Sequence, residues 1–202
     1  MSGTRIDFFR PTDQHGELSN FYALATPIVY RGKPYPTSEH LYQAMKFLGP
    51  GSTNLHQAYA DLIRRAKTPN MAKILAAQRV ADGHPWRVTL NAYISQSLRQ
   101  NVRPRADWDD VKQKKMLEVL LLKFEQDAHC RGVLLATGTA PLAEVSPYDS
   151  YWGTGPRGDG ENMLGKLLAE ARTVLRSGKQ GAKRKLKKRV EGVNKEARTE
   201  PV

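Results

Sequence analysis

The sequence predicts a mostly helical α+β fold in a single domain. Two observations carry this prediction: several segments place apolar residues at helical spacing, and only a few short runs have the composition of strands. A chain of 202 residues is long enough to bury one core. We expect the domain to span residues 1–176 and a basic, disordered tail to span residues 177–202.

The first half of the chain is expected to combine short strands with four helices. Residues 6–9 and 27–30 have the composition of strands, and Arg31-Gly32 after the second is a turn signal. Thr37 or Ser38 is suited to cap a following helix, and Thr68-Pro69 has the cap and first-turn proline of another. The expected helices cover residues 38–47, 54–66, 68–80 and 87–101.

The second half is expected to contain one long helix, two strands and a final helix. Asp107 is a candidate cap for a helix whose broad apolar stripe runs to Phe124. Residues 132–137 and 142–145 are apolar and short, which favours strands. A loop rich in Gly and Pro then leads to a helix that presents Leu164, Leu168 and Leu175 inward.

Composition limits the class of protein. The net charge is +12, and ten basic against three acidic residues lie from Arg176 onward. A single cysteine, Cys130, excludes an internal disulfide and suits a reducing compartment. The chain shows no run that would span a membrane, no secretory signal, and no metal-binding spacing among its five histidines. We expect a monomer that is cytoplasmic, or nuclear in a eukaryote, without a metal or other cofactor.

The helix expected after residue 37 carries the best candidates for chemistry. Glu39, Gln43 and Lys46 fall at i, i+4 and i+7, so they share one face opposite an apolar set. This pattern points a carboxylate, an amide and an amine in one direction. A solvated charged face would have the same spacing.

A second candidate region is the glycine-rich loop that precedes the last helix. Glycines allow a backbone to approach a ligand, and a helix N-terminus offers N–H groups to phosphate. Asp149 and Trp152 within the loop have the spacing of a polar contact and a stacking surface, although plain turns share this composition. Trp108 lies near Arg103 and Arg105, where it could stack on a base or fill the core.

Several sequence blocks resemble the NADAR family of YbiA-like N-glycosidases. The blocks are Leu-Ser-Asn-Phe at 18–21, Tyr-Pro-Thr-Ser-Glu-His at 35–40, Gln-Ala-Met-Lys-Phe at 43–47, Asp-Trp-Asp-Asp-Val-Lys at 107–112, Lys-Phe-Glu-Gln at 123–126, Leu-Leu-Ala-Thr-Gly at 134–138, Asp-Ser-Tyr-Trp-Gly at 149–153 and Asn-Met-Leu-Gly at 162–165. They follow one another over about residues 6–176. The stretch at 67–104 is longer than in compact bacterial members, so transfer from the family is least safe there.

The resemblance implies cleavage of an N-glycosidic bond. In the branch that removes ADP-ribose from guanine, the sugar is understood to pass through a lysine Schiff base, which requires a neutral amine and a carboxylate to move protons. Glu39 would then be the general acid/base, Lys46 the nucleophile and Asp149 an orienting or second carboxylate. Lys33 and Lys166 are competing nucleophiles.

The same resemblance implies the contacts to the substrate. Trp108 and Trp152 would stack, Asn20 and Arg31 would contact sugar or phosphate, and the loop and helix start at 153–165 would hold the pyrophosphate. The implied substrate-binding set is Asn20, Arg31, Gln43, Trp108, Trp152, Gly153, Asn162 and Gly165.

The sequence is compatible with three functions. The first is removal of ADP-ribose from ADP-ribosylated guanine in DNA or RNA, which fits the net positive charge of the chain. The second is an N-glycosidase for intermediates of riboflavin biosynthesis, which would keep the same residues but have no use for a basic tail. The third is a noncatalytic module that binds ADP-ribose or nucleic acid, which would need the pocket but neither Glu39 nor Lys46.

The tail generates a first prediction. Its basic centre can contact nucleic acid, serve as a nuclear import signal or aid solubility, and consists of Lys183, Arg184, Lys185, Lys187, Lys188 and Arg189. Deleting residues 177–202 should flatten the salt dependence of oligonucleotide binding, because each neutralised phosphate adds about 0.7–0.9 to the slope. Cleavage of a mononucleotide substrate should barely change. An unaltered slope would leave only the import or solubility role.

Overall fold

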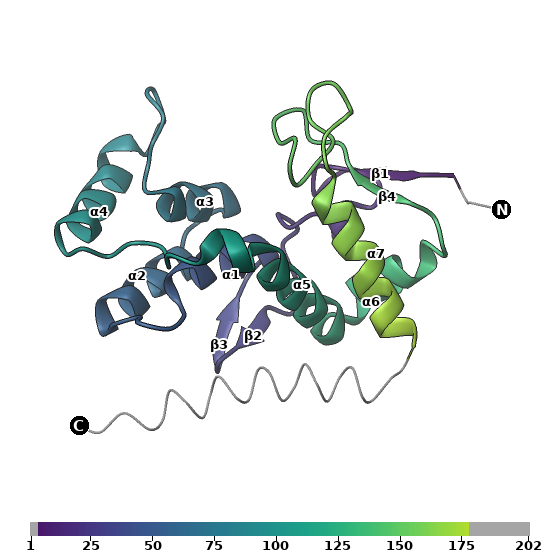
Figure 1. Cartoon of the computed structure of the whole chain (residues 1–202), viewed down its shortest axis with the longest axis horizontal. Coiled ribbons are helices and arrows are strands. Elements are labelled where there is room, and N and C mark those ends of the chain that lie inside the picture. Colours follow the sequence, from purple (N-terminus) through teal and green to yellow (C-terminus); the bar gives the residue numbers. More distant parts are fainter. Residues whose placement is uncertain (1–3, 178–202) are drawn as a thin grey trace.

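The computed structural model describes residues 4–177 as a mostly helical fold with four short strands (Figure 1). The predicted fold class is therefore confirmed. The basic segment from residue 178 lies outside the described residues. In chain order the elements are β1 (Ile6–Phe8), η1 (Gly16–Leu18), β2 (Ile28–Tyr30), β3 (Lys33–Tyr35), α1 (Ser38–Ala44), η2 (Met45–Phe47), α2 (Asn54–Arg64), α3 (Pro69–Ala77), α4 (Arg87–Arg99), α5 (Trp108–Gln126), α6 (Ala128–Ala136), β4 (Leu142–Glu144) and α7 (Met163–Arg176).

The strands form two small pairs instead of one sheet. β1 pairs in parallel with β4, with Ile6 opposite Leu142, so the N-terminal strand meets a segment far along the chain. β2 and β3 form an antiparallel hairpin in which Ile28 lies opposite Tyr35. Arg31 and Gly32 both have positive φ angles, of 50° and 73°, which is the backbone that a tight two-residue hairpin turn requires.

Helix α5 is the centre of the molecule. Its buried side chains include Met116, Leu120 and Phe124, which confirms the predicted stripe. Helices α2, α3 and α4 gather on one side of it in Figure 1, and α6, α7 and the β1–β4 pair lie on the other. α5 packs on α1, α6 and α7, and α1 packs on α2 and α3. The central helix thus holds the two halves together.

One buried lysine joins α5 to the N-terminal segment. Lys123 is fully buried, and its Nζ donates to the carbonyl oxygens of Glu17 at 2.6 Å and Ser19 at 3.0 Å. Burial lowers the pKa of this ammonium to about 8. The contact fixes the segment leading to Asn20, whose carbonyl accepts the backbone N–H of Glu39 at 3.0 Å. Lys123 therefore determines where α1 begins relative to α5.

Two local predictions need correction. Residues 132–137 were expected to form a strand, but most of them belong to α6. Asp127 caps that helix by accepting the Cys130 N–H at 2.8 Å, and Cys130 and Leu134 face the core at helical spacing. The helix expected over 38–47 is α-helical only to Ala44, after which η2 continues as a 3₁₀ turn.

Gly165 generates a prediction about stability. A Cβ at this position would collide with the carbonyl oxygen of Leu142, where α7 crosses β4. Gly165→Ala should lower the free energy of unfolding by about 1–3 kcal/mol, as overpacking does. Gly132→Ala is the control, because the space around Gly132 in α6 is open and a helical alanine should stabilise by about 0.5–1 kcal/mol. Urea denaturation of both variants measures the difference, and equal stability would contradict the packing argument.

Candidate active site

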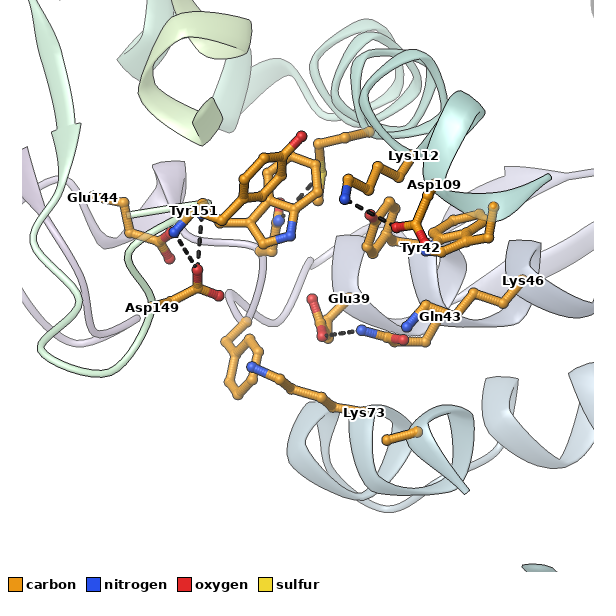
Figure 2. A pocket seen from close by; sticks show the side chains of 16 residues that line it. Glu39, Tyr42, Gln43, Lys46, Lys73, Asp109, Lys112, Glu144, Asp149 and Tyr151 are labelled. Carbon is orange, nitrogen blue, oxygen red and sulfur yellow. Dashed lines mark hydrogen bonds and ion pairs between the residues drawn. The ribbon is translucent and has the colours of Figure 1, made fainter. Parts of the chain in front are cut away.

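A cavity of about 400 Å³ opens between the two halves of the molecule (Figure 2). This volume lies within the usual range for small-molecule sites, about 300–1,000 Å³. The wall combines acids, bases, amides and aromatic rings. Its lining residues are Asn20, Phe21, Glu39, Tyr42, Gln43, Lys46, Lys73, Ala77, Trp108, Asp109, Lys112, Met116, Glu144, Asp149, Tyr151 and Trp152.

Helix α1 places the first carboxylate of the cavity. Thr37 caps the helix by accepting the His40 N–H, so Glu39 lies in the first turn. Its side chain is only 5% exposed, and Oε1 accepts a hydrogen bond of 2.7 Å from Nε2 of Gln43 one turn later. Lys46 follows from η2 and also lines the cavity. The predicted common direction of the three side chains is thus visible in Figure 2.

Burial gives this carboxylate and amine opposite pKa shifts. Desolvation raises the pKa of Glu39, and the Gln43 hydrogen bond and the charges of Lys73 and Lys46 only oppose that rise. Desolvation lowers the pKa of Lys46, although the charge of Glu39 acts against it. Both shifts favour the uncharged forms. A proton-carrying carboxyl and a neutral amine in one cavity are the forms needed for acid catalysis and nucleophilic attack.

Aromatic rings form another side of the cavity. The ring of Tyr42 lies 5.0 Å from that of Trp108 and 5.6 Å from that of Trp152, measured between centroids. Tyr151 packs edge-on against Trp152 at 5.0 Å. Nζ of Lys46 lies 5.6 Å from the Trp108 ring, which places the amine beside an aromatic surface. Such surfaces suit a planar base or ring of a ligand.

Two further carboxylates face Glu39 from the other half of the molecule (Figure 2). Oδ1 of Asp149 accepts the backbone N–H groups of Tyr151 at 3.0 Å and Trp152 at 2.8 Å, so Asp149 orients the aromatic pair. Glu144 lies at the end of β4. Burial, followed by the charges of Asp149 and Glu39, raises its pKa to about 7. Near neutral pH this side chain exchanges a proton readily.

Two lysines add positive charge to the same cavity. Lys73 extends from α3 toward Glu39 in Figure 2. Lys112 of α5 donates to Asp109 at 3.0 Å and lies 4.5 Å from the Tyr151 ring centroid. Cations next to carboxylates in one cavity would orient a ligand that carries both an anionic group and a leaving group.

Two buried amide oxygens complete the polar wall. Oδ1 of Asn20 and Oε1 of Gln43 have no hydrogen-bond partner within the described part of the chain. Both residues line the cavity. Because an unpaired buried acceptor is costly, these atoms are suited to accept hydrogen bonds from a ligand's hydroxyl or amino groups.

The structure brings together most of the residues selected from the sequence. Glu39, Lys46 and Asp149 line the cavity with four of the expected binding residues, which are Asn20, Gln43, Trp108 and Trp152. Of the competing lysines, Lys33 pairs with Asp61 at 2.7 Å on the hairpin side, and Lys166 is exposed on α7. Neither lysine lines the cavity.

The other four expected binding residues lie away from the cavity lining. Arg31 is exposed in the β2–β3 turn. Asn162 donates to the Leu142 carbonyl at 2.8 Å and accepts the Glu144 N–H at 3.0 Å, so its amide supports β4. Gly153 and Gly165 allow close backbone approach to Glu144 and Leu142. Ligand contacts by these four residues remain predictions without support from this geometry.

Backbone N–H groups at the start of α7 already have hydrogen-bond partners within the protein. The backbone N–H groups of Met163 and Leu164 donate to the carbonyls of Tyr151 and Trp152, each at 3.0 Å. The expected pyrophosphate position at 153–165 therefore competes with existing hydrogen bonds. These bonds instead fix the loop that carries Asp149 and Trp152.

Sequence reasoning missed several residues of the cavity, above all Lys73 and Glu144. Lys73 lies in the stretch where transfer from the family was least safe, and Glu144 ends a three-residue strand. The short apolar run at 142–145 predicted a strand, but it did not indicate that Glu144 would face a cavity. Among the described residues, no group of three or more His, Cys, Asp or Glu side chains is placed to hold a metal ion. None of the described helices has both the length and the apolar character to cross a membrane.

Comparisons with known proteins identify the family. Residues 7–176 match the family model described as NADAR domain. N-glycosidase YbiA of Escherichia coli (strain K12) is 39% identical over 175 residues, which cover 87% of this chain and 91% of that protein. The chloroplastic riboflavin biosynthesis protein PYRR of Zea mays is 32% identical over 173 residues, covering 84% of this chain and 25% of that protein.

A solved structure agrees with the sequence comparisons. The NMR structure of the E. coli protein YbiA superposes with a TM-score of 0.65 at 37% identity, covering 89% of each chain. The chain therefore belongs to the NADAR family and has the YbiA-like fold. The resemblance seen in the sequence blocks is confirmed.

Glu39 generates the prediction for this site. Glu39→Gln should lower turnover by about 10²–10⁴, the usual contribution of proton transfer, and change ligand affinity by less than about tenfold. The amide retains a hydrogen-bonding partner for Gln43, so the cavity should persist. Glu125→Gln, at an exposed position of α5, is the matched control. Single-turnover rates at saturating substrate test both variants, and an unchanged rate for Glu39→Gln would remove Glu39 from the mechanism.

Proposed function

We propose that this protein is an N-glycosidase that removes ADP-ribose from ADP-ribosylated guanine in nucleic acid. The observation that carries the proposal is the pairing of Glu39 and Lys46 in one cavity, where burial shifts both pKa values toward the uncharged forms. Family membership supports the class of bond, because the E. coli relative is named an N-glycosidase. The aromatic side of the cavity supports a base as the leaving group.

The proposed reaction is an exchange of one nitrogen for another at the anomeric carbon. The neutral amine of Lys46 attacks this carbon, the ribose ring opens, and the bond to the guanine nitrogen breaks. A carboxyl protonates the departing nitrogen, which leaves the sugar as a lysine Schiff base and releases the guanine. Water then hydrolyses the Schiff base, releasing ADP-ribose with its aldehyde and the free lysine.

Two carboxyls are placed to move the protons. Glu39 is in the first turn of α1 near Lys46, and its raised pKa suits a general acid/base. Once it has donated its proton, the carboxylate is suited to take protons from the amine and from water. Glu144 has a pKa near 7, which suits donation to the departing nitrogen. Asp149 holds Trp152 in place through backbone hydrogen bonds, so its proposed role is orientation of the stacked base.

A metabolite substrate is the second candidate. The match to a riboflavin biosynthesis protein favours it, because that protein carries a related domain within a longer chain. The same carboxyls and amine would serve a glycosylated intermediate of riboflavin biosynthesis. Comparing an ADP-ribosylated guanine oligonucleotide with a riboflavin-pathway intermediate in parallel assays separates the two candidates. Turnover of the metabolite alone would contradict our proposal.

The covalent step generates a further prediction. Borohydride added during turnover of the oligonucleotide should reduce the Schiff base and add mass within residues 34–47, at Lys46. Trapping should be greatest near neutral pH. Rising pH increases the neutral fraction of the amine, but above about pH 7 it removes the proton that Glu144 donates. Peptide mapping by mass spectrometry locates the adduct.

Matched variants make this result specific. Lys46→Arg should abolish the adduct, whereas Lys33→Arg and Lys166→Arg should retain it, because those two lysines lie outside the cavity lining. An adduct on Lys73 would keep the covalent mechanism and move the nucleophile to α3. Active turnover without any adduct would favour direct attack by water, with Lys46 acting through its charge.

A further inference from the structure

The positive charge of the folded domain is concentrated in one stretch, residues 64–105, which we call the basic lobe. It contains nine Lys or Arg residues against one acidic residue, Asp82. The rest of residues 1–175 contains thirteen basic and sixteen acidic residues. The surplus of positive charge before the tail therefore comes from the lobe, which contains α3 and α4. In Figure 1 these two helices form one side of the molecule.

The basic lobe borders the cavity. Lys73 and Ala77 of α3 belong to the cavity wall. At the end of the lobe, the backbone N–H of Arg105 donates to the Lys46 carbonyl at 2.7 Å, next to the proposed nucleophile. A long anion bound on the lobe would therefore pass the mouth of the site.

Two arginines of the lobe are free to meet an anion. Arg79 and Arg99 are exposed, and neither forms an ion pair within the described residues. The hydrogen bond of 3.0 Å between Gln78 and Ser97 shows that the end of α3 and α4 meet near these arginines. By contrast, Arg64, Arg87 and Arg105 form ion pairs with Asp61, Asp82 and Asp107.

An exposed aromatic ring lies beside another cation of the lobe, Lys67, at the start of α4. Trp86 is 46% exposed, and Nζ of Lys67 lies 4.8 Å from its ring centroid. A large exposed aromatic next to a lysine offers a stacking face for a base and a charge for the neighbouring phosphate. Arrays of cations with interleaved aromatic rings are characteristic of surfaces that bind single-stranded nucleic acid.

We propose that the basic lobe is the docking surface for a single strand of nucleic acid, with Arg79, Arg99 and Lys67 on phosphates and Trp86 stacked on a base that flanks the modified guanine. The inference rests on the proposed function for the reason to bind a strand. The inference goes beyond the proposed function because it assigns affinity for the polymer to residues outside the cavity. A metabolite substrate has no need of this surface.

Charge reversal tests the surface by binding alone. The variant Arg79→Glu/Arg99→Glu is compared with Lys114→Glu/Arg10→Glu, which changes net charge equally at exposed positions outside the lobe. The probe is an unmodified, fluorescently labelled single-stranded oligonucleotide, titrated by anisotropy from about 50 to 200 mM salt. The lobe variant should bind at least about tenfold more weakly than the control, with a salt slope lower by about 1.4, because each phosphate that is no longer neutralised removes about 0.7 from the slope.

Two further variants keep the result interpretable. Trp86→Ala should weaken oligonucleotide binding by about tenfold, because the flanking base then has no ring to stack on, and should leave the salt slope unchanged. If the reversed variant does not fold, Arg79→Gln/Arg99→Gln should show the same decrease in slope. In all lobe variants, turnover of an ADP-ribosylated guanine mononucleotide should be unchanged.

Failure of this inference differs from failure of the proposed function. Equal affinity and slope in the lobe and control variants would overturn the docking surface, whatever the enzyme cleaves. Lobe variants that lose binding to anionic phospholipid vesicles, but keep oligonucleotide binding, would also overturn it. Weakened oligonucleotide binding in the lobe variants, with no cleavage of ADP-ribosylated guanine by the unaltered protein, would support the surface and contradict the proposed function.

Discussion

The structure depends on a buried ammonium that joins the central helix to the N-terminal segment. Lys123 donates to two backbone carbonyls, of Glu17 and Ser19, and so holds the segment that ends at Asn20. The Asn20 carbonyl in turn receives the first-turn N–H of Glu39. Hydrogen bonds from a charged group contribute about 1.5–3 kcal/mol each, enough to fix this connection against local motion. The position of the Glu39 backbone thus depends in part on the contact between Lys123 and the segment that leads to Asn20.

The cavity collects its charges from several elements. Glu39, Lys46 and Lys73 come from α1, η2 and α3, and α5 adds Asp109 and Lys112. β4 and the following loop supply Glu144 and Asp149. Burial makes each charged form expensive, which raises the pKa of the Glu39 carboxyl and lowers that of the Lys46 amine. The proposed proton transfer and amine attack depend on these two shifts.

In our proposals the cavity carries out the reaction, and the basic lobe recognises the nucleic acid. Residues deep in the cavity would handle the sugar and the base, while the basic lobe would hold phosphates outside the reacting atoms. The chain is similar both to small N-glycosidases and to part of a longer riboflavin biosynthesis protein. A shared fold does not by itself fix the substrate, so the proposal assigns recognition of the polymer to a surface outside the cavity. The lobe lies in the stretch where the sequence made transfer from the family least safe, which is where such a difference would be expected.

The sequence by itself determined the family, the fold class, most helices and the α1 residues of the site. Helix caps and apolar periodicity are local, so Thr37, the α5 stripe and the spacing of Glu39, Gln43 and Lys46 were readable from neighbouring residues. Tertiary structure decided how distant segments pack together. Residues 132–136 belong to helix α6 where a strand was expected, and Lys73 and Glu144 line the cavity from separate elements. It also decided the direction of the pKa shifts of Glu39 and Lys46, because desolvation depends on every chain segment that covers a group, and no local pattern records that.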